Sequence, residues 1–124
     1  MSMNFLLIEA LQKFHYFFGD SFKIEFPTGS GRELNLWDVS LELERRLTGL
    51  FSRGPDGRRP CFANDPRFAA DPHWRDLIQF FEYFDGDTGR GLGASHQTGW
   101  TALVAKMVQQ VQHFCPRDKQ SGIL

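Results

Sequence analysis

An aromatic run that carries a carboxylate constrains the fold more than any other stretch of the sequence. Residues 80–84 read FFEYF, and five glycines follow between positions 86 and 99. Glycine is favoured where the chain reverses or where its backbone comes close to another group. The pair Asp85-Gly86 is a typical turn signal between two extended segments. We therefore expect a β-hairpin or extended pair within residues 77–95.

Glu82 is the carboxylate in this run, and its setting predicts a functional role. A charge among aromatic rings is costly to bury, and such burial raises the pKa of a carboxyl group. A group tuned in this way suits general acid or base catalysis near neutral pH. The reversal is expected to bring Glu82 near His96, Gln97 and Trp100, which can hydrogen-bond a sugar and stack on its apolar face.

The residues around the run also allow plainer interpretations. Glu82 can be a structural partner of Arg75 or Arg90 on an ordinary hairpin. Trp74 and Arg75 either line a sugar pocket or pack and pair locally. The sequence leaves these alternatives open, but each of them places the informative residues in the second half of the chain.

Periodic apolar residues predict three main helices, near residues 4–18, 35–51 and 98–114. The first is apolar on nearly all sides, which is typical of a helix enclosed by neighbours. If those neighbours are absent, rings on this helix should be exposed to solvent. Asn35 followed by an acid three positions later predicts an N-cap for the second helix, and Thr98 is expected to cap the last. The fold class is therefore mainly α, with a β-hairpin.

The remaining segments are predicted from local signals. Residues 22–26 alternate as in a short strand, and residues 60–72 are expected to form an irregular loop. Charged side chains of the second helix are expected on its solvated face: Glu42, Glu44, Arg45 and Arg46. A small basic tip after that helix is interpreted as solvated rather than binding: Arg53, Arg58 and Arg59.

Composition excludes several classes of function. The net charge is −1 and the basic residues are scattered, which argues against nucleic-acid binding. No run of eighteen apolar residues predicts a membrane span. The histidines match no zinc spacing, and Cys61 and Cys115 form no CxxC pair. We expect a cytoplasmic protein without cofactor or metal, and with neither nucleic acid nor membrane as a partner.

The second half of the chain resembles a known enzyme family. The runs DPHWRDL (71–77), EYF (82–84) and GRGLGASHQTGWT (89–101) are similar to the C-terminal end of glycoside hydrolase family 63 proteins. These are relatives of processing α-glucosidases and of mannosylglycerate hydrolases. NFLLIEAL (4–11) and PTGSGR (27–32) also resemble bacterial members, and the likeness extends to about Gln112.

The resemblance implies a fold and a mechanism. Family members have an (α/α)6 barrel of the six-hairpin glycosidase type and hydrolyse glycosidic bonds with inversion. The position matched by Glu82 is the family's general base. Side chains that the resemblance places at the sugar are His96, Gln97 and Trp100, in addition to the candidates Trp74 and Arg75 named above. The implied substrate is an oligosaccharide or a small glycoside of glucosyl or mannosyl type.

The resemblance also implies an incomplete catalytic unit. The family's general acid lies in sequence upstream of the matched region. Residues 1–124 are therefore expected to be the C-terminal fragment of a barrel, with residues 115–124 as a tail, and to be inactive without the upstream part. The alternative is a carbohydrate-binding or protein-interaction module without catalysis.

Overall fold

The computed structural model describes residues 1–114, and they form a mainly α-helical fold with two small β-hairpins. Its three long helices confirm the sequence prediction: α1 (Ser2–Phe18), α2 (Leu36–Gly49) and α4 (Val104–Phe114). A 3-10 turn, η2 (Thr101–Leu103), leads into α4. The tail predicted at residues 115–124, which includes Cys115, lies outside the described residues.

Two antiparallel hairpins connect the helices. The strands β1 (Lys23–Glu25) and β2 (Glu33–Asn35) pair between α1 and α2. The strands β3 (Tyr83–Phe84) and β4 (Gly91–Leu92) form the hairpin that was predicted within residues 77–95. The strand predicted at 22–26 is confirmed by β1, whereas its partner β2 was not foreseen.

Residues 60–72 are more ordered than an irregular loop, which corrects the sequence prediction. They contain a 3-10 turn, η1 (Pro60–Phe62), and a short helix, α3 (Pro66–Ala70). Asp65 caps α3, because its side chain accepts a hydrogen bond from the Arg67 backbone N–H. Pro66 then fits the first helical position, where its missing N–H costs nothing.

The predicted cap of α2 is confirmed and that of the last helix is wrong. The Asn35 side chain accepts a hydrogen bond from the Asp38 N–H at 2.8 Å. Thr98 lies in a turn well before α4, and no side chain caps η2, which follows that turn. The helix starts later than its apolar pattern predicts because residues 98–100 form a turn and residues 101–103 form the 3-10 turn η2.

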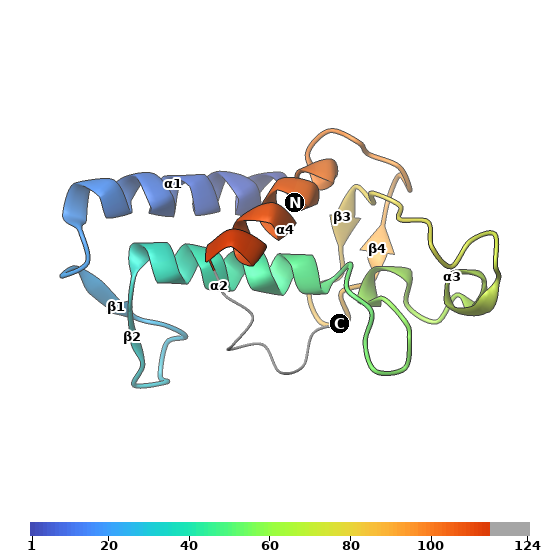
Figure 1. Cartoon of the computed structure of the whole chain (residues 1–124), viewed down its shortest axis with the longest axis horizontal. Helices are drawn as coiled ribbons and strands as arrows, with labels where there is room; N and C mark the ends of the chain where they lie inside the picture. The colour runs from blue at the N-terminus through green and yellow to red at the C-terminus, as the bar shows by residue number, and fades with distance from the viewer. Residues whose placement is uncertain (115–124) are drawn as a thin grey trace.

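Helices α1 and α2 lie side by side and antiparallel, and α4 crosses them (Figure 1). Their shared core includes Ile8, Val39 and Met107, all buried. An ion pair between Lys106 of α4 and Glu9 of α1 joins two of the helices at 2.5 Å. This three-helix arrangement forms one end of the molecule, and the β3–β4 hairpin and α3 lie at the other (Figure 1).

A second core packs beneath the hairpin. Its members come from the end of α2, from η1, α3 and the start of α4: Phe51, Cys61, Phe62, Phe68 and Val104. The Phe62 and Phe68 rings stack with centroids 3.9 Å apart. Three rings of the aromatic run pack against this core: Phe80, Phe81 and Phe84. The run thus ties the hairpin to the helices.

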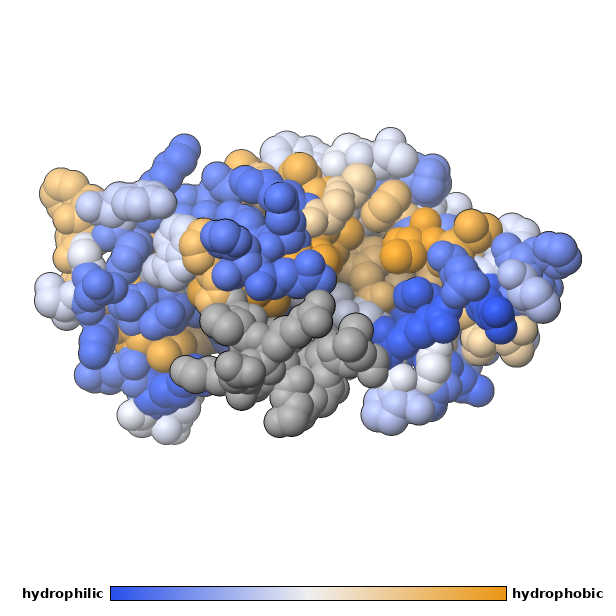
Figure 2. Space-filling model, viewed as in Figure 1, coloured by the Kyte–Doolittle hydropathy of each residue, from blue (hydrophilic) through white to orange (hydrophobic). Residues whose placement is uncertain are grey.

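The C-terminal end of α1 carries exposed rings. Phe17 is 80% exposed, and Phe14, Phe18 and Phe22 are also exposed. The Phe18 and Phe22 rings stack at 4.8 Å. Figure 2 shows the corresponding hydrophobic patch at the end of the molecule beside β1. The prediction that α1 shows apolar side chains to solvent is confirmed at Phe17, at Phe18 and at Leu6, whereas Phe5 is only partly exposed.

No helix within residues 1–114 is long and apolar enough to cross a membrane.

Candidate functional site

Glu82 lies immediately before β3, in a hairpin whose tip is held by local hydrogen bonds. The Asp85 carboxylate accepts hydrogen bonds from the Thr88 hydroxyl at 2.7 Å and from the Thr88 backbone N–H at 2.8 Å. These bonds keep the pKa of Asp85 below its ordinary value. Gly89 has a positive φ of 74° at the start of the return, a conformation that glycine adopts without strain.

The Glu82 carboxylate is hydrogen-bonded to the backbone of the segment that follows β4. Its Oε2 accepts a hydrogen bond from the Ala94 N–H at 3.2 Å, and the Glu82 N–H donates to the Ala94 carbonyl at 2.9 Å. A Cβ atom placed on Gly93 would lie 2.6 Å from Glu82 Oε2. Glycine at position 93 therefore allows the carboxylate to approach the backbone this closely.

Two more hydrogen bonds extend this alignment toward the last helix. The Gln97 N–H donates to the Phe80 carbonyl at 2.5 Å, and the Thr101 hydroxyl donates to the Phe81 carbonyl at 2.6 Å. The segment that contains His96 and Gln97 therefore runs beside Glu82. The expectation that the reversal brings these parts of the chain together is confirmed at the level of the backbone.

Glu82 is exposed to solvent, so the expectation that aromatic rings bury its carboxylate is wrong. The physical reason is the alternation of side chains along an extended segment. The ring of Phe81 turns inward, against Gly91 and within 6.0 Å of the Phe62 ring. Its neighbour Glu82 must then point to the opposite face, away from the core.

The other candidate residues fall into two groups. His96 lies with its ring 5.7 Å from that of Phe80, and Trp100 packs against Phe5 at 6.4 Å while staying half exposed. These two lie on the segment that returns past Glu82. Trp74 and Arg75 lie instead in the turn after α3.

Local packing explains the second group. The Trp74 ring contacts the Phe68 ring edge-on at 5.6 Å, and the Arg67 guanidinium lies 5.7 Å from its centroid. Arg75 pairs with Asp76 at 3.3 Å. No ion pair within residues 1–114 joins Glu82 to Arg75 or to Arg90. Trp74 and Arg75 thus have local packing and pairing partners in this turn.

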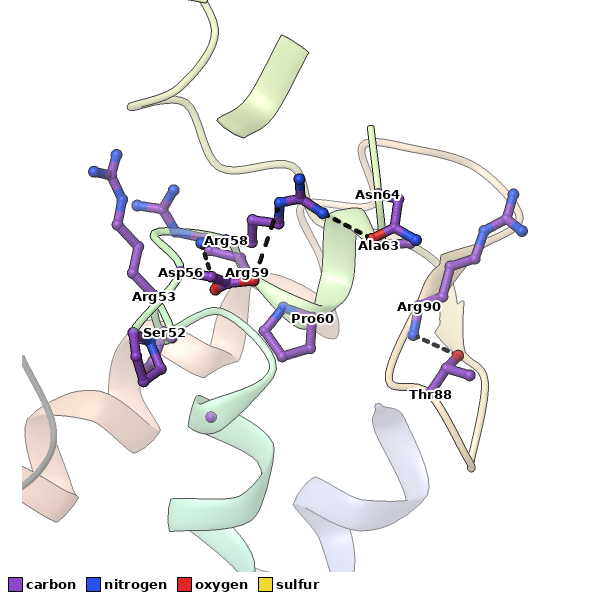
Figure 3. Close-up of a pocket in the computed structure, with 13 residues that line it drawn as sticks. Ser52, Arg53, Asp56, Arg58, Arg59, Pro60, Ala63, Asn64, Thr88 and Arg90 are labelled. Atoms are coloured by element: carbon purple, nitrogen blue, oxygen red, sulfur yellow. Dashed lines mark hydrogen bonds and ion pairs between the residues drawn. The ribbon is translucent and has the colours of Figure 1, made fainter. Parts of the chain in front are cut away.

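A second candidate site was missed by the sequence analysis. An open pocket of about 950 Å³ lies between the loop after α2 and the turn of the β3–β4 hairpin. Four arginines line it: Arg53, Arg58, Arg59 and Arg90. Figure 3 shows Arg90 across the pocket from the other three. We call this the arginine pocket. The first three were predicted as a solvated tip, and no local signal links them to Arg90, which is distant in sequence.

Hydrogen bonds distinguish the four arginines. Arg59 donates to the carbonyls of Phe51 and Arg75, at 2.9 and 3.0 Å. Arg53 donates to the same Arg75 carbonyl at 2.8 Å and pairs with Asp76 at 2.6 Å. Burial, together with the positive charge of Arg53, lowers the pKa of Arg59. The pocket therefore concentrates positive charge.

A second pocket, of about 660 Å³, adjoins the first. The two share the lining residues Ala63, Asn64 and Arg90. Trp74 and Gln79 also line this second pocket, which we call the Trp74 pocket. Trp74 lines this pocket, and Glu82 is among the lining residues of neither pocket.

Glu44 departs most from its predicted setting. The sequence placed it on the solvated face of α2, whereas it is fully buried between α1, α2 and α4. Its Oε1 accepts a hydrogen bond from Gln12 Nε2 at 3.0 Å, and its Oε2 has no partner. Burial raises the pKa of Glu44 to about 7. Glu44 lies four residues from Ser40 and four from Thr48, which are also buried, so this spacing places the three side chains on one face of α2. That shared face is the sequence signal for the burial of Glu44.

The residues described, 1–114, contain no group of three or more His, Cys, Asp or Glu side chains arranged to hold a metal ion.

The described chain is thus a mainly α-helical protein with a hairpin-borne, solvent-exposed carboxylate and a neighbouring basic pocket. It is 52% identical over 116 residues to the uncharacterized protein YMR196W of Saccharomyces cerevisiae. This match covers 92% of the chain and 11% of the yeast protein, so the chain spans a small part of the relative it matches. No protein family and no solved structure matches the chain.

Proposed function

We propose that the chain is the C-terminal part of the catalytic barrel of an inverting α-glycosidase of the glycoside hydrolase family 63 type, and that Glu82 is its general base. The observation that carries this proposal is the geometry of Glu82. Its carboxylate is exposed, and the Ala94 N–H fixes it through Oε2. Within residues 1–114 its Oε1 has no hydrogen-bond partner, which leaves that atom free to accept a proton from water.

Inversion requires a second carboxyl group. In this mechanism an acid protonates the leaving oxygen while a base on the other side of the sugar activates water, with about 6.5–9.5 Å between the two carboxyl groups. We place that acid in the upstream part of the enzyme, which is the implied partner of this chain. Glu82 alone then has no turnover, because departure of the leaving group remains uncatalysed.

The segment beside Glu82 supplies groups for a sugar. His96, Gln97 and Trp100 lie on the segment after β4 that runs past Glu82, and Trp100 keeps half of its surface exposed. An exposed indole offers a flat apolar face to a pyranose, while imidazole and amide groups hydrogen-bond its hydroxyls. The proposed substrate is an oligosaccharide or a small glycoside of glucosyl or mannosyl type. Trp74 and Arg75 are proposed to contact more distant parts of it.

The helices support the proposal of a barrel. Helices α1 and α2 form an antiparallel pair, which is the repeating unit of an (α/α)6 barrel, and α1 exposes rings such as Phe14 and Phe17 on the outside of that pair. Further helices packed on α1 would cover those rings. The 52% identity to a stretch of a much longer yeast protein is in keeping with a part of a larger fold.

The same exposed rings favour a second candidate function. Phe17, Phe18 and Phe22 form a connected aromatic surface at the end of α1. Such a surface also fits a protein-interaction module that has no catalytic role. The two functions differ in one respect, since an interaction module does not require the carboxylate of Glu82.

A transplant experiment tests the proposed function. The matched 116-residue stretch of the yeast relative is replaced by this chain, and the hybrid is incubated with a panel of α-glucosides and α-mannosides. We expect hydrolysis of at least one substrate with inversion, which proton NMR detects as the β-anomer of the first sugar released. This chain by itself should release none. Retention of configuration, or hydrolysis by this chain alone, would contradict the proposal.

A further inference from the structure

We propose that the arginine pocket is a binding site for a phosphate monoester. This inference does not rest on the proposed glycosidase activity, since Glu82 does not line the pocket. The charge of the lining, the arginines that remain available and the neighbouring Trp74 pocket all favour such a ligand.

The lining carries an excess of positive charge. Four arginines face one carboxylate among the lining residues, that of Asp56, whose Oδ2 lies 4.0 Å from Arg58 Nε. Asp76 neutralises Arg53 from outside the lining. The Asp85 carboxylate accepts a hydrogen bond from Thr88 and makes no ion pair with Arg90. The charge of Arg90 contributes only a minor part of the lowering of the Asp85 pKa. A dianion would meet this surplus, and the planar guanidinium group matches phosphate oxygens in charge and geometry.

Two of the four arginines make structural hydrogen bonds, and the other two have guanidinium nitrogen atoms available to a ligand. Arg53 and Arg59 both donate to the Arg75 carbonyl and thereby tie the turn after α3 to the end of α2. Arg58 donates to Asn64 Oδ1 at 3.1 Å through Nη1, which leaves its other terminal nitrogen free of hydrogen bonds within residues 1–114. No hydrogen bond or ion pair within the same residues engages the Arg90 guanidinium.

These two available groups come from opposite sides of the pocket. Arg58 lies in the loop after α2, and Arg90 precedes β4 in the hairpin (Figure 3). Asn64 lies between them in the same view. Both side chains are long and exposed, so each can turn its guanidinium group toward a phosphate group placed beside Asn64. Both side chains are at the surface, so either can be replaced without opening the core.

The adjoining Trp74 pocket indicates what the phosphate is attached to. Arg90 and Asn64 line both pockets, so a ligand anchored at the arginines extends toward Trp74 and Gln79. A partly exposed indole beside amide groups suits a sugar ring. The structure therefore favours a sugar phosphate over free phosphate, although both share the chemistry that the arginines recognise.

Titration of the full chain followed by amide NMR tests the site. The probes are inorganic phosphate, glucose 6-phosphate and glucose, each added at constant ionic strength with sodium chloride. We expect saturable shifts of the amides of residues 53–64 and 88–90 with both phosphates and none there with glucose. Glucose 6-phosphate should bind more tightly and should also shift the Trp74 indole signal.

Matched variants complete the test. Arg58→Gln and Arg90→Gln should each weaken phosphate binding about tenfold or more, because each removes a charge-assisted hydrogen bond. Arg32→Gln, in the exposed β1–β2 turn, should bind as the wild type does and controls for net charge. The spectra of the variants report directly whether they are folded. Equal weakening by all three variants, or no saturable shift, would overturn the phosphate site. Equal affinity for the two phosphates would overturn its extension to a sugar.

Discussion

Gln12 of α1 donates a hydrogen bond from Nε2 to Oε1 of Glu44 of α2 at 3.0 Å, in the interior of the three-helix core. Gln110 of α4 reaches the same Gln12 through a longer contact of 3.5 Å. Glu44 Oε2 and Gln110 Oε1 both lack partners. Oxygen atoms without a donor are costly to bury, and a proton on Glu44 would remove the charge that burial penalises most.

This network makes stability depend on pH. The pKa of Glu44 is raised to about 7 from an ordinary 4.5, first by burial and in part by the charge of Glu9, while Gln12 and Lys106 oppose the shift. Between these two values the folded state binds more protons than the unfolded state, so the free energy of unfolding falls as pH rises. The full change corresponds to about 3 kcal/mol. Urea unfolding at pH 5 and pH 8 should show this loss, and Glu44→Gln should remove most of it.

A neighbouring glutamate provides the control. Hydrogen bonds from Arg45 and Arg46 lower the pKa of Glu42. Its contribution to stability is therefore lost only as pH falls below about 4.5, the opposite direction. Glu42→Gln should keep the wild-type change between pH 5 and pH 8. A wild-type stability that is constant over this range would show that Glu44 is not buried as described.

Gly93 should control the position of the Glu82 carboxylate. A Cβ atom at position 93 would lie 2.6 Å from Glu82 Oε2, and the positive φ of 74° adds strain of about 1 kcal/mol or more for any other residue. In Gly93→Ala we expect the hydrogen bond from the Ala94 N–H to Glu82 to be lost. The Ala94 amide proton should then exchange with solvent faster in the variant than in the wild type, as NMR measures. Gly86→Ala, which has open space around its Cβ, should behave as the wild type.

The ring stack of Phe62 on Phe68 should dominate the stability of the second core. Phe68 is buried and its ring lies 3.9 Å from that of Phe62. Phe68→Ala should lower the free energy of unfolding by about 3–5 kcal/mol, since it deletes a buried ring and leaves a cavity. Phe17→Ala removes the same atoms from a side chain that is 80% exposed and should change stability by roughly 0.5 kcal/mol or less. Similar losses in both variants would contradict the assignment of the core.

Cys61 should be chemically inert while the protein is folded. Burial raises the pKa of its thiol to about 11, from an ordinary 9.0. The fraction of Cys61 present as the reactive thiolate at pH 8 is then about a hundredfold lower. Burial of the side chain adds steric protection. Mass spectrometry of the Cys61 peptide after brief iodoacetamide treatment should find little label in the native protein and rapid labelling in urea. Fast native labelling would place Cys61 at the surface.

Local sequence signals predicted the hairpin well. Turn residues between positions 85 and 89 reverse the chain where expected, and Asn35 caps α2 as its spacing to Asp38 indicated. These features depend on a few adjacent residues. The orientation of Glu82 was not predictable in the same way, because it depends on which neighbour faces the core. Phe81 takes that position, and the alternation of side chains then turns Glu82 outward.

The features missed by the sequence analysis all depend on distant parts of the chain. Glu44 looked solvated because α2 carries a charged face, and it is buried only where α1 and α4 pack against α2. Arg90 joins Arg58 in one pocket only because the hairpin folds back beside the loop after α2. Periodicity within one helix cannot report such contacts.

The most direct test of this account is the turnover of the hybrid enzyme with and without the Glu82 carboxylate. Glu82→Gln keeps the shape of the side chain and its acceptor for the Ala94 N–H but removes the base, so kcat should fall by about 10²–10⁴ or more while sugar binding is retained. Asp87→Asn, at the tip of the same hairpin, should leave turnover within about twofold of the wild type. Near-normal kcat in Glu82→Gln would contradict the assignment of Glu82 as the general base.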